Sequence, residues 1–327
     1  MTGKTISQAF VEYLDTIATA RSENTARAYR NAIRFFAQTI AQKDLSPDET
    51  KISELTEAAI TWLAADLKAY TPATEQLYLT AVVGFYKYLA AEDLAQVNLP
   101  RVKMLVKMRS RPAGVRLPQF SGDLIEQMLS YAQSISAAPA DGDKERLQNL
   151  RDRAFLLTLA ETGLRVHEAC NLRRGDIDWN EGKSILIGKG NREAIVRFAS
   201  RSLRALKDYL EARAPLDGAS GRPLPSLPVF ARHDKGAGSK IKPITTTTGR
   251  NIVNQRVREC LGAEAVGTIT PHTFRHYFVT TVLIGSGGNL KLAQELARHQ
   301  SIAVTQRYAH LSNEELDRGY HDIFEQP

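Results

Sequence analysis

The sequence predicts a mainly α-helical protein with one small antiparallel β-sheet, divided into a helical N-terminal domain and a larger α+β domain. Apolar side chains recur at helical spacing through the first hundred residues. One short region, residues 176–198, holds three strand-like segments joined by turns. At 327 residues the chain also exceeds what one hydrophobic core usually supports, so two domains are expected.

The N-terminal domain, residues 1–98, is expected to be a bundle of four helices. The apolar repeat that begins at Ile6 predicts the first helix. Ser22 or Asn24 is a suitable N-cap for the second helix, because either side chain can accept a hydrogen bond from a free backbone N–H. Two further helices follow, and Pro72 opens the last of them.

Residues 99–118 are expected to form a basic linker between the domains. The segment LPRVKMLVKMRSRPAGVRLP carries six basic residues and no acid, and it ends in the proline- and glycine-rich stretch typical of a boundary. A solvated linker explains this composition as well as a clamp on a phosphate backbone does. The candidate DNA-binding residues on the second interpretation are Arg101, Lys103, Lys107, Arg109 and Arg111.

The second domain, residues 119–327, is expected to alternate helices with the small sheet. An apolar helix at 150–159 breaks at Gly163, and a helix resumes over 166–172. The stretch 215–243 is rich in Pro, Gly and Ser and is expected to be a loop. The three strands are expected at 176–179, 184–187 and 194–198, and the later helices at about 201–213, 246–261, 271–284, 289–297 and 301–309, before a tail at 312–327.

The composition limits the classes of function. The chain is 43% hydrophobic and 24% charged, and no apolar run approaches the ~20 residues that span a bilayer. The N-terminus carries acids and lacks the apolar stretch of a signal peptide, and the only cysteines, Cys170 and Cys260, form no CxxC pattern. We therefore expect a cytoplasmic protein. Its net charge of +7 suits a polyanionic partner.

A nucleotide-binding loop is excluded by spacing. The run Gly182-Lys183-Ser184 has the ending of a P-loop, but the pattern needs glycine five residues earlier, where Ile177 stands. The run also lies between two expected strands, whereas a P-loop joins a strand to a helix. No cofactor is expected.

The segment TPHTFRHYFVTTVL marks a helix start that carries two polar side chains. Thr270 can cap the helix and Pro271 is favoured at its first position. His272 and Arg275 are three residues apart and so occupy neighbouring positions on one face. Taken alone, a capping histidine and a surface arginine are the commoner explanation.

Two other segments offer cationic side chains. In ETGLRVHEACNL, Arg165 and Glu168 could form a surface ion pair worth only ~0.2–0.5 kcal/mol. Apolar neighbours on both sides of Arg165 instead suggest that it is partly buried and holds a definite anion. In ILIGKGNREAIVRF, Lys189 lies at a hairpin tip, where a lysine is normally solvated but could also enter a groove of a bound duplex.

The segment RHQSIAVTQRYAHLS places Tyr308 between His299 and His310. The ring shares a helical face with apolar residues and is expected to be partly packed. A zinc site built from His272, His299 and His310 lacks any supporting cysteine or carboxylate spacing, so no metal is expected.

Taken in order, these four segments resemble the tyrosine recombinase, or phage-integrase, family. The stretches ARSENTARAYRNAIRFF and TPATEQLYLTAVVGFYKYL resemble that family's helical, SAM-like core-binding domain, in an Xer-like layout. The resemblance covers essentially the whole chain. It implies a site-specific DNA recombinase that cuts and rejoins strands through a 3′-phosphotyrosyl intermediate, without metal or ATP, in integration, excision or resolution, as in mobile elements.

The resemblance also implies which residues bind the phosphate. Arg165 and Arg275 match the two arginines that hold the non-bridging oxygens of the scissile phosphate. Lys189 matches the hairpin lysine that gives a proton to the leaving 5′-oxygen. Glu168 matches the acidic residue that orients its neighbours in the site.

The same resemblance assigns the nucleophile and its histidines. Tyr308 matches the nucleophile, His272 a proton-transfer residue, and His299 the histidine that hydrogen-bonds the phosphate. A phenol with a pKa near 10 needs such help to lose its proton at neutral pH. One position departs from the family pattern: Arg298 stands where glycine usually precedes the histidine.

Two other functions remain open at this point, a type IB topoisomerase and a DNA-binding regulator without catalysis. The regulator would explain the charge but not the match of Lys189, His299 and Tyr308.

The resemblance also implies partners and a location. Double-stranded DNA is the substrate, weakly associated protomers form a tetramer in the synapse, and a second recombinase is an optional partner. The location is nucleoid-associated, without membrane contact. The tail 312–327 is expected either to dock on a neighbouring protomer or to fold back.

Overall fold

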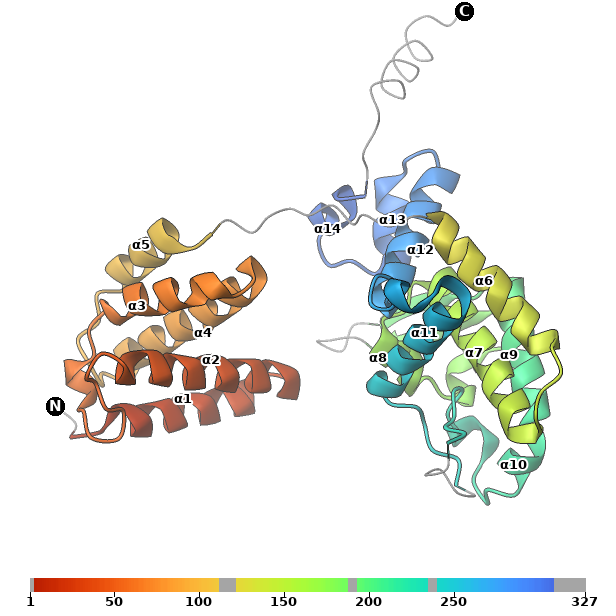
Figure 1. The fold of residues 1–327 in the computed structure, drawn as a ribbon, viewed down its shortest axis with the longest axis horizontal. Coiled ribbons are helices and arrows are strands. Elements are labelled where there is room, and N and C mark those ends of the chain that lie inside the picture. Colours follow the sequence, from red (N-terminus) through yellow and green to blue (C-terminus); the bar gives the residue numbers. More distant parts are fainter. Residues whose placement is uncertain (1–2, 112–121, 188–192, 235–239, 309–327) are drawn as a thin grey trace, which may run out of the picture. The chain divides into compact units, whose positions relative to one another are not determined.

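The structure is a computed structural model that describes residues 3–111, 122–187, 193–234 and 240–308. The chain divides into two compact units, Met1–Val115 and Arg116–Pro327 (Figure 1). Each unit has its own hydrophobic core. No helix in the described ranges is both long and apolar enough to cross a membrane.

The first unit is a bundle of helices whose starts are set by capping residues. Thr5 caps α1, Ser22 caps α2, and Thr71 caps α4 ahead of a proline at its first turn. In each case the side-chain oxygen accepts a backbone N–H that the helix itself cannot satisfy. The elements of this unit are α1 (Ile6–Ala20), α2 (Glu23–Ala41), a 3-10 turn (Ile52–Glu54), α3 (Ala59–Asp66), a second 3-10 turn (Leu67–Ala69), α4 (Pro72–Ala91) and α5 (Leu99–Arg109).

Aromatic rings fill the centre of this bundle. Phe10 of α1 lies 4.7 Å from Phe85 of α4 and 5.9 Å from Phe36 of α2, measured between ring centroids. Phe36 and Phe85 are fully buried. Edge and tilted ring contacts of this kind add to the stability that burial itself supplies. The four helices predicted from the apolar repeats are present as α1 to α4.

Helix α5 occupies most of the segment expected to be a linker. Asn98 accepts the backbone N–H of Arg101, which starts the helix one residue before a proline. Val102 is fully buried in the core of the first unit. The first unit therefore extends through α5. The basic composition of the segment concealed this helix because its apolar face is narrow.

The second unit holds the small sheet among many helices. Its elements are α6 (Gly122–Ala137), α7 (Asp143–Thr162), α8 (Val166–Asn171), β1 (Ile177–Asp178), β2 (Lys183–Ile187), β3 (Glu193–Arg197), α9 (Ser200–Ala212), α10 (Ala214–Gly218), α11 (Thr246–Leu261), α12 (Pro271–Gly285), α13 (Leu290–Ala297) and α14 (Ile302–Gln306), with short 3-10 turns at Arg174–Asp176, Leu224–Ser226 and Ala263–Ala265. Helix α6 and the first turns of α7 were not expected. Residues 143–149 hold only one apolar side chain, Leu147, so they gave no apolar repeat.

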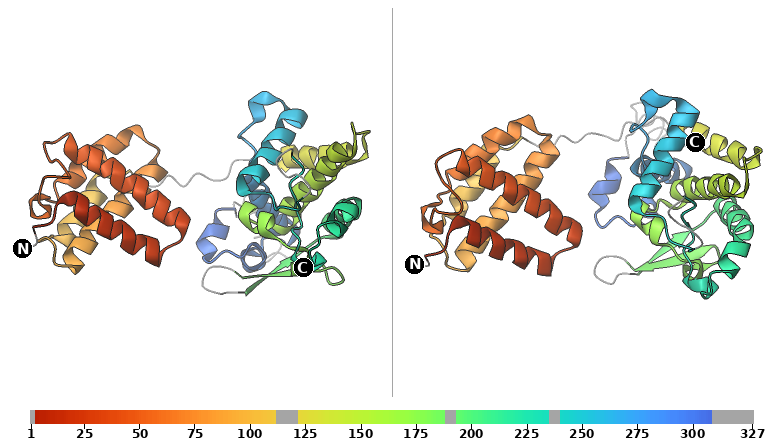
Figure 2. Two further views of the ribbon diagram at one scale, coloured as in Figure 1. Left: turned by 90° about the horizontal axis from the view of Figure 1, so that it is seen from below. Right: turned by 60° about the horizontal axis from the view of Figure 1, so that its bottom comes forward.

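The three strands form an antiparallel sheet in the order β1-β2-β3. Ser184 pairs with Val196, and both are buried, whereas the next pair, Ile185 and Ile195, is exposed. This alternation is the period of two expected for a sheet with one covered face. Both views in Figure 2 place the sheet at the edge of the helical part of this unit.

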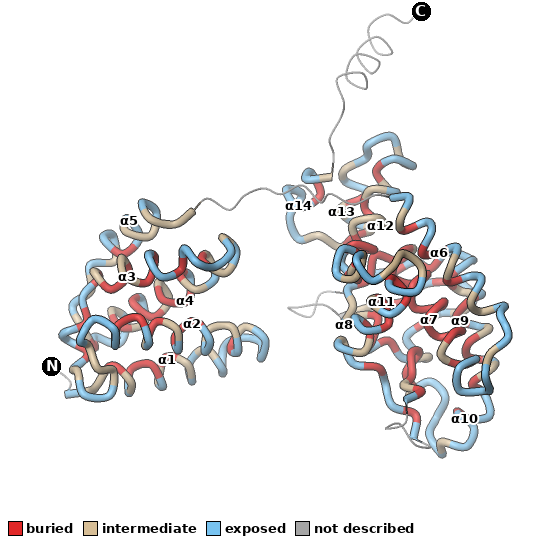
Figure 3. Tube along the Cα trace, viewed as in Figure 1, coloured by how far each residue is buried: buried red, intermediate tan, exposed pale blue. Residues whose placement is uncertain are grey.

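Helix α7 runs through the middle of the second unit and is almost wholly buried from Leu147 onward (Figure 3). Phe155, Leu156 and Leu157 are covered on successive faces, so the helix is surrounded rather than amphipathic. Helices α6, α9 and α12 all pack against it. The position of the carboxyl end of α7 is consequently fixed by contacts along the buried part of the helix.

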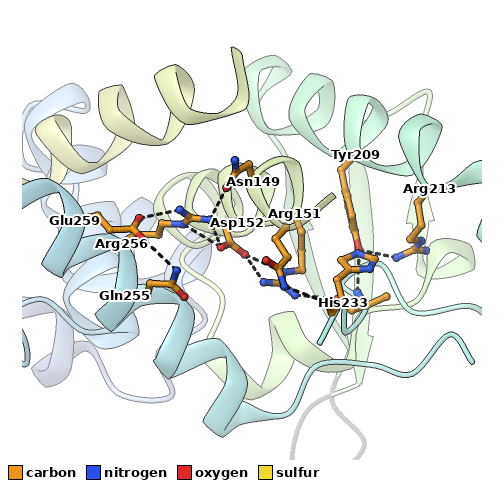
Figure 4. A network of polar contacts seen from close by, with 11 residues as sticks. Asn149, Arg151, Asp152, Tyr209, Arg213, His233, Gln255, Arg256 and Glu259 are labelled. Atoms are coloured by element: carbon orange, nitrogen blue, oxygen red, sulfur yellow. Dashed lines mark hydrogen bonds and ion pairs between the residues drawn. The ribbon is translucent and has the colours of Figure 1, made fainter. Parts of the chain in front are cut away.

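A network of polar side chains inside this unit joins α7 to its neighbours (Figure 4). Asp152 of α7 accepts hydrogen bonds from Arg256 of α11 at 2.8 and 3.0 Å, and from Arg151 beside it. Arg213 next to α9 binds Asp217 and the carbonyl oxygen of Val229. Part of the stretch 215–243, expected to be a loop, is thus tied into the core, and α10, which begins at Ala214, extends into it. Each charged side chain named in this network has a partner, as burial requires.

Candidate active site

Helix α12 presents His272, Arg275 and His276 on neighbouring positions of its first turns. Thr270 caps the helix by accepting the N–H of Thr273, as the sequence predicted. On the opposite side Phe274 is fully buried in the core. The capped start of α12 and the buried Phe274 ring fix the orientation of the helix. The three polar side chains therefore point to the same side of it.

Arg275 is the most buried cation of this group, with 3% of its surface exposed. One guanidinium nitrogen donates to the carbonyl oxygen of Gly163 at the end of α7, and another donates to that of Ala297 at the end of α13. Burial lowers the pKa of Arg275 to about 10, with the charges of Arg165 and Arg298 acting in the same direction. The side chain therefore connects three helices and stays protonated at neutral pH.

The turn between α7 and α8 depends on Gly163. Its φ of +59° lies in the left-handed region, and a Cβ at this position would collide with the Phe278 ring. Arg165 follows in extended conformation and caps α8, with its backbone N–H donating to Glu168 at 2.8 Å. The turn thus delivers Arg165 beside α12.

Arg165 is more exposed than the sequence suggested. Its side chain is 45% exposed, and Nη1 donates to Oε1 of Glu168 at 3.0 Å. The expectation of partial burial is therefore corrected. The apolar neighbours in the sequence point into the core, while the extended backbone at the helix cap directs the arginine outward. The anion it holds within the chain is Glu168.

Glu168 collects hydrogen bonds from two arginines. Its Oε2 accepts the N–H of Arg165 and, at 3.2 Å, Nη2 of Arg298. Burial raises the pKa of Glu168, but these hydrogen bonds and the two positive charges outweigh burial and hold the pKa below its ordinary value. The carboxylate is therefore charged at neutral pH and fixes both guanidiniums.

Tyr308 follows α14 and faces the histidines of α12. Its hydroxyl hydrogen-bonds Nδ1 of His276, and its ring stacks on His299 with centroids 6.4 Å apart. Burial raises the pKa of Tyr308, while the charges of Arg275 and Arg307 act to lower it. The hydroxyl thus lies within the electrostatic reach of the buried arginine.

The three histidines of the site are neutral at physiological pH. Burial lowers the pKa of His276 to about 4, assisted by His272, whose ring centroid is 4.1 Å away, and by Arg275. Burial and nearby arginines likewise lower the pKa of His299 to about 4, and they lower that of His272. A neutral imidazole keeps a lone pair that can accept a proton.

The structure brings together most of the site residues expected from the sequence. Arg165, Glu168, His272, Arg275, His299 and Tyr308 surround one region at the ends of α7, α12 and α13. Lys189 falls in 188–192, outside the described residues, although Ile187 and Glu193 on either side of that stretch are paired.

The five candidate DNA-binding residues lie on α5 or just after it, in the first unit. Lys103 and Lys107 are exposed. Arg101 pairs with Glu57 at 3.5 Å. Arg111 binds the fully buried Glu75 at 2.5 Å and the carbonyl oxygen of Tyr70 at 2.6 Å. The side chain of Arg111 therefore has a structural partner within its own unit.

Sequence reasoning missed His276 as a partner of the tyrosine. The available signal was its spacing: His276 lies four residues after His272, which places both rings on one helical face. It also missed the contacts of Arg298. No residue in the same segment indicated that the arginine would turn inward.

The arrangement favours an anion. Arg165, Arg275 and Arg298 bring three positive charges against the single carboxylate of Glu168. Fixed guanidiniums with a phenol beside them suit the binding and attack of a phosphoryl group. Within the described ranges no cluster of three His, Cys, Asp or Glu side chains could hold a metal ion. His310 lies outside those ranges.

Family models match both parts of the chain. The model described as the phage integrase family matches residues 121–315. The model described as the phage integrase N-terminal SAM-like domain matches residues 8–93. The first match contains every residue of the site described above, and the second covers α2 to α4 and most of α1.

Similar proteins and structures extend over the whole chain. The tyrosine recombinase XerC of Treponema denticola is 29% identical over 96% of this chain and 98% of its own length. A XerC from Staphylococcus aureus is 27% identical over 94% and 93%. The Tn1549 transposon integrase in complex with transposon right end DNA has a TM-score of 0.68 at 17% identity, covering 99% of this chain and all of that one. The XerH recombinase bound to difH substrate has a TM-score of 0.67 at 18% identity, covering 98% and 85%. These two likenesses show the fold.

Proposed function

This chain belongs to the phage integrase family, and we propose from that premise that its site cuts and rejoins DNA strands with Tyr308 as the nucleophile. It is a tyrosine-type site-specific recombinase. The observation that carries the assignment of the nucleophile is the contact of the Tyr308 hydroxyl with His276, beside the buried Arg275.

The reaction balances without an external energy source. The phenolic oxygen of Tyr308 attacks a backbone phosphorus, the P–O bond to the 5′-oxygen breaks, and a 3′-phosphotyrosyl bond forms. The phenolic proton passes to a neutral imidazole, and His276 is the acceptor in contact with the hydroxyl. The leaving 5′-oxygen takes a proton from a general acid, the role proposed for Lys189. A second 5′-hydroxyl then attacks the phosphotyrosine and restores a phosphodiester.

The charges of the site supply what the transition state needs. Negative charge grows on the equatorial phosphate oxygens as the new bond forms, and fixed cationic donors stabilise it most effectively when they need no rearrangement. Arg275 is already held by two carbonyl oxygens, and Arg165 by Glu168. We infer that these two guanidiniums bind the non-bridging oxygens, and that His272 and His299 complete the proton-transfer and phosphate contacts.

Double-stranded DNA is the proposed substrate, and relatives of this fold have been captured on DNA. Exposed Lys103 and Lys107 offer phosphate contacts from α5. We infer assembly of four protomers on two duplexes, because two strand exchanges need four nucleophiles, and a location with the chromosome in the cytoplasm. The tail 312–327 lies outside the described residues, and its docking on a neighbouring protomer stays a prediction.

A covalent selection tests the proposal and identifies the target sequence in one experiment. Duplexes with a randomised centre and a fixed nick are incubated with the protein, denatured, and recovered by their attachment to it. The wild-type protein is expected to capture a defined sequence and to leave a free 5′-hydroxyl that a kinase can label. Tyr308→Phe is expected to bind the selected duplex but to capture none.

The other outcomes identify the competing functions. Sequence-specific binding without any covalent complex would contradict the enzyme assignment and indicate a regulator. Covalent capture without sequence preference, together with relaxation of a supercoiled plasmid that lacks the selected site, would indicate a topoisomerase.

A further inference from the structure

Arg298 adopts a backbone conformation that is unfavourable for an arginine. It follows the last residue of α13 with φ +57° and ψ +43°, in the left-handed region. The other two described non-glycine residues with positive φ are Asp44 and Asp93. Aspartate tolerates this region because its short side chain can bond locally, but arginine has no such compensation. Local backbone preference therefore does not explain an arginine here.

The side chain of Arg298 turns inward and is only 9% exposed. Its Nη1 donates to the carbonyl oxygen of Thr162 at 3.4 Å, and its Nη2 to that of Gly163 at 3.2 Å. Both carbonyls belong to the carboxyl end of α7, where backbone acceptors lack helical partners and the helix dipole favours a cation. Nε is buried and has no acceptor among the described residues.

The inward side chain joins the elements that carry the site. Arg298 directly precedes His299, whose ring hydrogen-bonds Oγ1 of Thr305 in α14 at 2.9 Å, and α14 leads to Tyr308. Its Nη2 also reaches Oε2 of Glu168, the carboxylate that holds Arg165. The Arg298 guanidinium is thus bonded to the carboxyl end of α7 and to Glu168, the acid that orients Arg165. The backbone of Arg298 sets the direction of the segment that leads to Tyr308.

Stability alone gives a poor account of this residue. The left-handed backbone and the buried Nε without an acceptor both disfavour the folded state. Burial lowers the pKa of Arg298, and the charge of Arg165 acts in the same direction, while Glu168 opposes both. A glycine would relieve the backbone and remove the desolvated charge. What a glycine could not do is hold the α13–α14 segment against α7.

We propose that Arg298 is a positioning residue. Its guanidinium fixes the α13–α14 segment, which carries His299 and leads to Tyr308, against the carboxyl end of α7. Through Glu168 it also orients Arg165. The inference rests on the proposed function. The described contacts through which Arg298 acts are those with the carbonyl oxygens of Thr162 and Gly163 and with the carboxylate of Glu168.

The test separates binding from chemistry on the duplex recovered by the covalent selection. Arg298→Gly is expected to slow single-turnover formation of the covalent complex by on the order of 100-fold, because small misplacement of reacting groups has effects of that size. Its affinity for the same duplex, measured in the Tyr308→Phe background, is expected to stay within about threefold, since the phosphate-binding arginines remain. Arg298→Lys keeps the charge without the planar fork and is expected to recover part of the rate.

A matched control isolates the backbone effect. Asp44→Gly places glycine at the same left-handed conformation, φ +59°, in the first unit and is expected to leave the rate unchanged. Hydrogen exchange gives a second measurement: amides of residues 298–308 are expected to exchange faster in Arg298→Gly, while those of α7 before its last turn do not change.

Each outcome decides one question. If the wild-type protein forms no covalent complex, the proposed function fails. If it does, and Arg298→Gly cleaves at the wild-type rate or its 298–308 amides exchange as before, the positioning role is overturned. Loss of rate together with equal loss of affinity in both Arg298→Gly and Arg298→Lys would also overturn it, because that pattern indicates general disruption.

Discussion

At the scale of single residues, the acidity of Tyr308 is governed by opposing influences. Burial holds the phenol in its neutral form, while Arg275 favours the phenolate. The contact with His276 offers a path for the proton. Because the pKa of His276 lies at about 4, this imidazole is available as an acceptor across the whole neutral range. The wild-type cleavage rate should therefore change little with pH across this range.

A His276→Ala variant tests this arrangement. At pH 7 we expect covalent complex formation to slow by about 100-fold, the lower end of what general base catalysis contributes. The deficit should shrink as pH rises toward the pKa of the phenol, because the phenolate then forms without a base. In the wild type the rate should stay nearly constant down to pH 5, because the pKa of His276 lies at about 4. Single-turnover rates between pH 5 and 9.5 measure both effects, and parallel profiles for the two proteins would contradict the role of His276.

A substitution of Arg165 should reduce the cleavage rate with little effect on stability. Its side chain is nearly half exposed, so replacing it with lysine should change the free energy of unfolding by no more than about 0.5 kcal/mol. Loss of a bidentate donor to the phosphate should slow cleavage by about 10²- to 10³-fold. Arg201→Lys is the matched control, because Arg201 is a half-exposed arginine paired with Glu161 in the same unit. Chemical denaturation and cleavage rates together provide the check; an equal rate loss in both variants would contradict a phosphate contact specific to Arg165.

At the scale of secondary structure elements, local signals predicted the site better than the packing around it. Helix α12 was predicted because a capping threonine, a proline and an apolar stripe coincide at its start. Helix α5 was expected to be part of a linker because the six basic residues of the stretch 99–118 obscured the one buried valine. The outward direction of Arg165 and the inward direction of Arg298 were not predictable, since both depend on how α7, α8 and α13 meet in three dimensions.

Helix α5 and its end provide a contrast between structural and DNA-binding cations. Arg111→Ala removes a partner from the fully buried Glu75 and should destabilise the first unit by about 2 kcal/mol, although Lys68 still binds that carboxylate. Lys107 is exposed, so Lys107→Ala should leave stability unchanged but reduce the slope of log affinity against log salt by about 0.9. Thermal unfolding and salt-dependent binding distinguish the two, and an unchanged salt slope in Lys107→Ala would remove it from the DNA contact.

At the scale of the whole molecule, the two units differ in the kind of groups they bury. The first unit is centred on aromatic rings. The second places a polar network around α7, and every histidine in the described ranges belongs to this unit. Among them His233 is 7% exposed, and Tyr209 hydrogen-bonds its Nε2 at 2.8 Å. As pH falls, we therefore expect the second unit to lose stability at a higher pH than the first.

Burial lowers the pKa of His233 to about 3, and the charges of Arg151, Arg213 and Lys144 act in the same direction against a smaller opposing effect of Asp234. In the unfolded chain this histidine has its ordinary pKa near 6.5, so between about pH 6.5 and 3 the unfolded state binds the extra proton. The stabilisation is complete above pH 6.5 and is lost progressively as pH falls. At pH 5 the loss from His233 alone amounts to about 2 kcal/mol, from 1.36 kcal/mol per pKa unit. The lowered pKa values of His272, His276 and His299 likewise make the folded state less stable as pH falls.

We expect the unfolding temperature of the second unit to fall between pH 7 and 5 while that of the first unit does not. The variant His233→Gln is expected to reduce this shift. Calorimetry at a series of pH values measures it, and a transition that stays at the same temperature down to pH 5 would show that His233 is protonated in the folded protein.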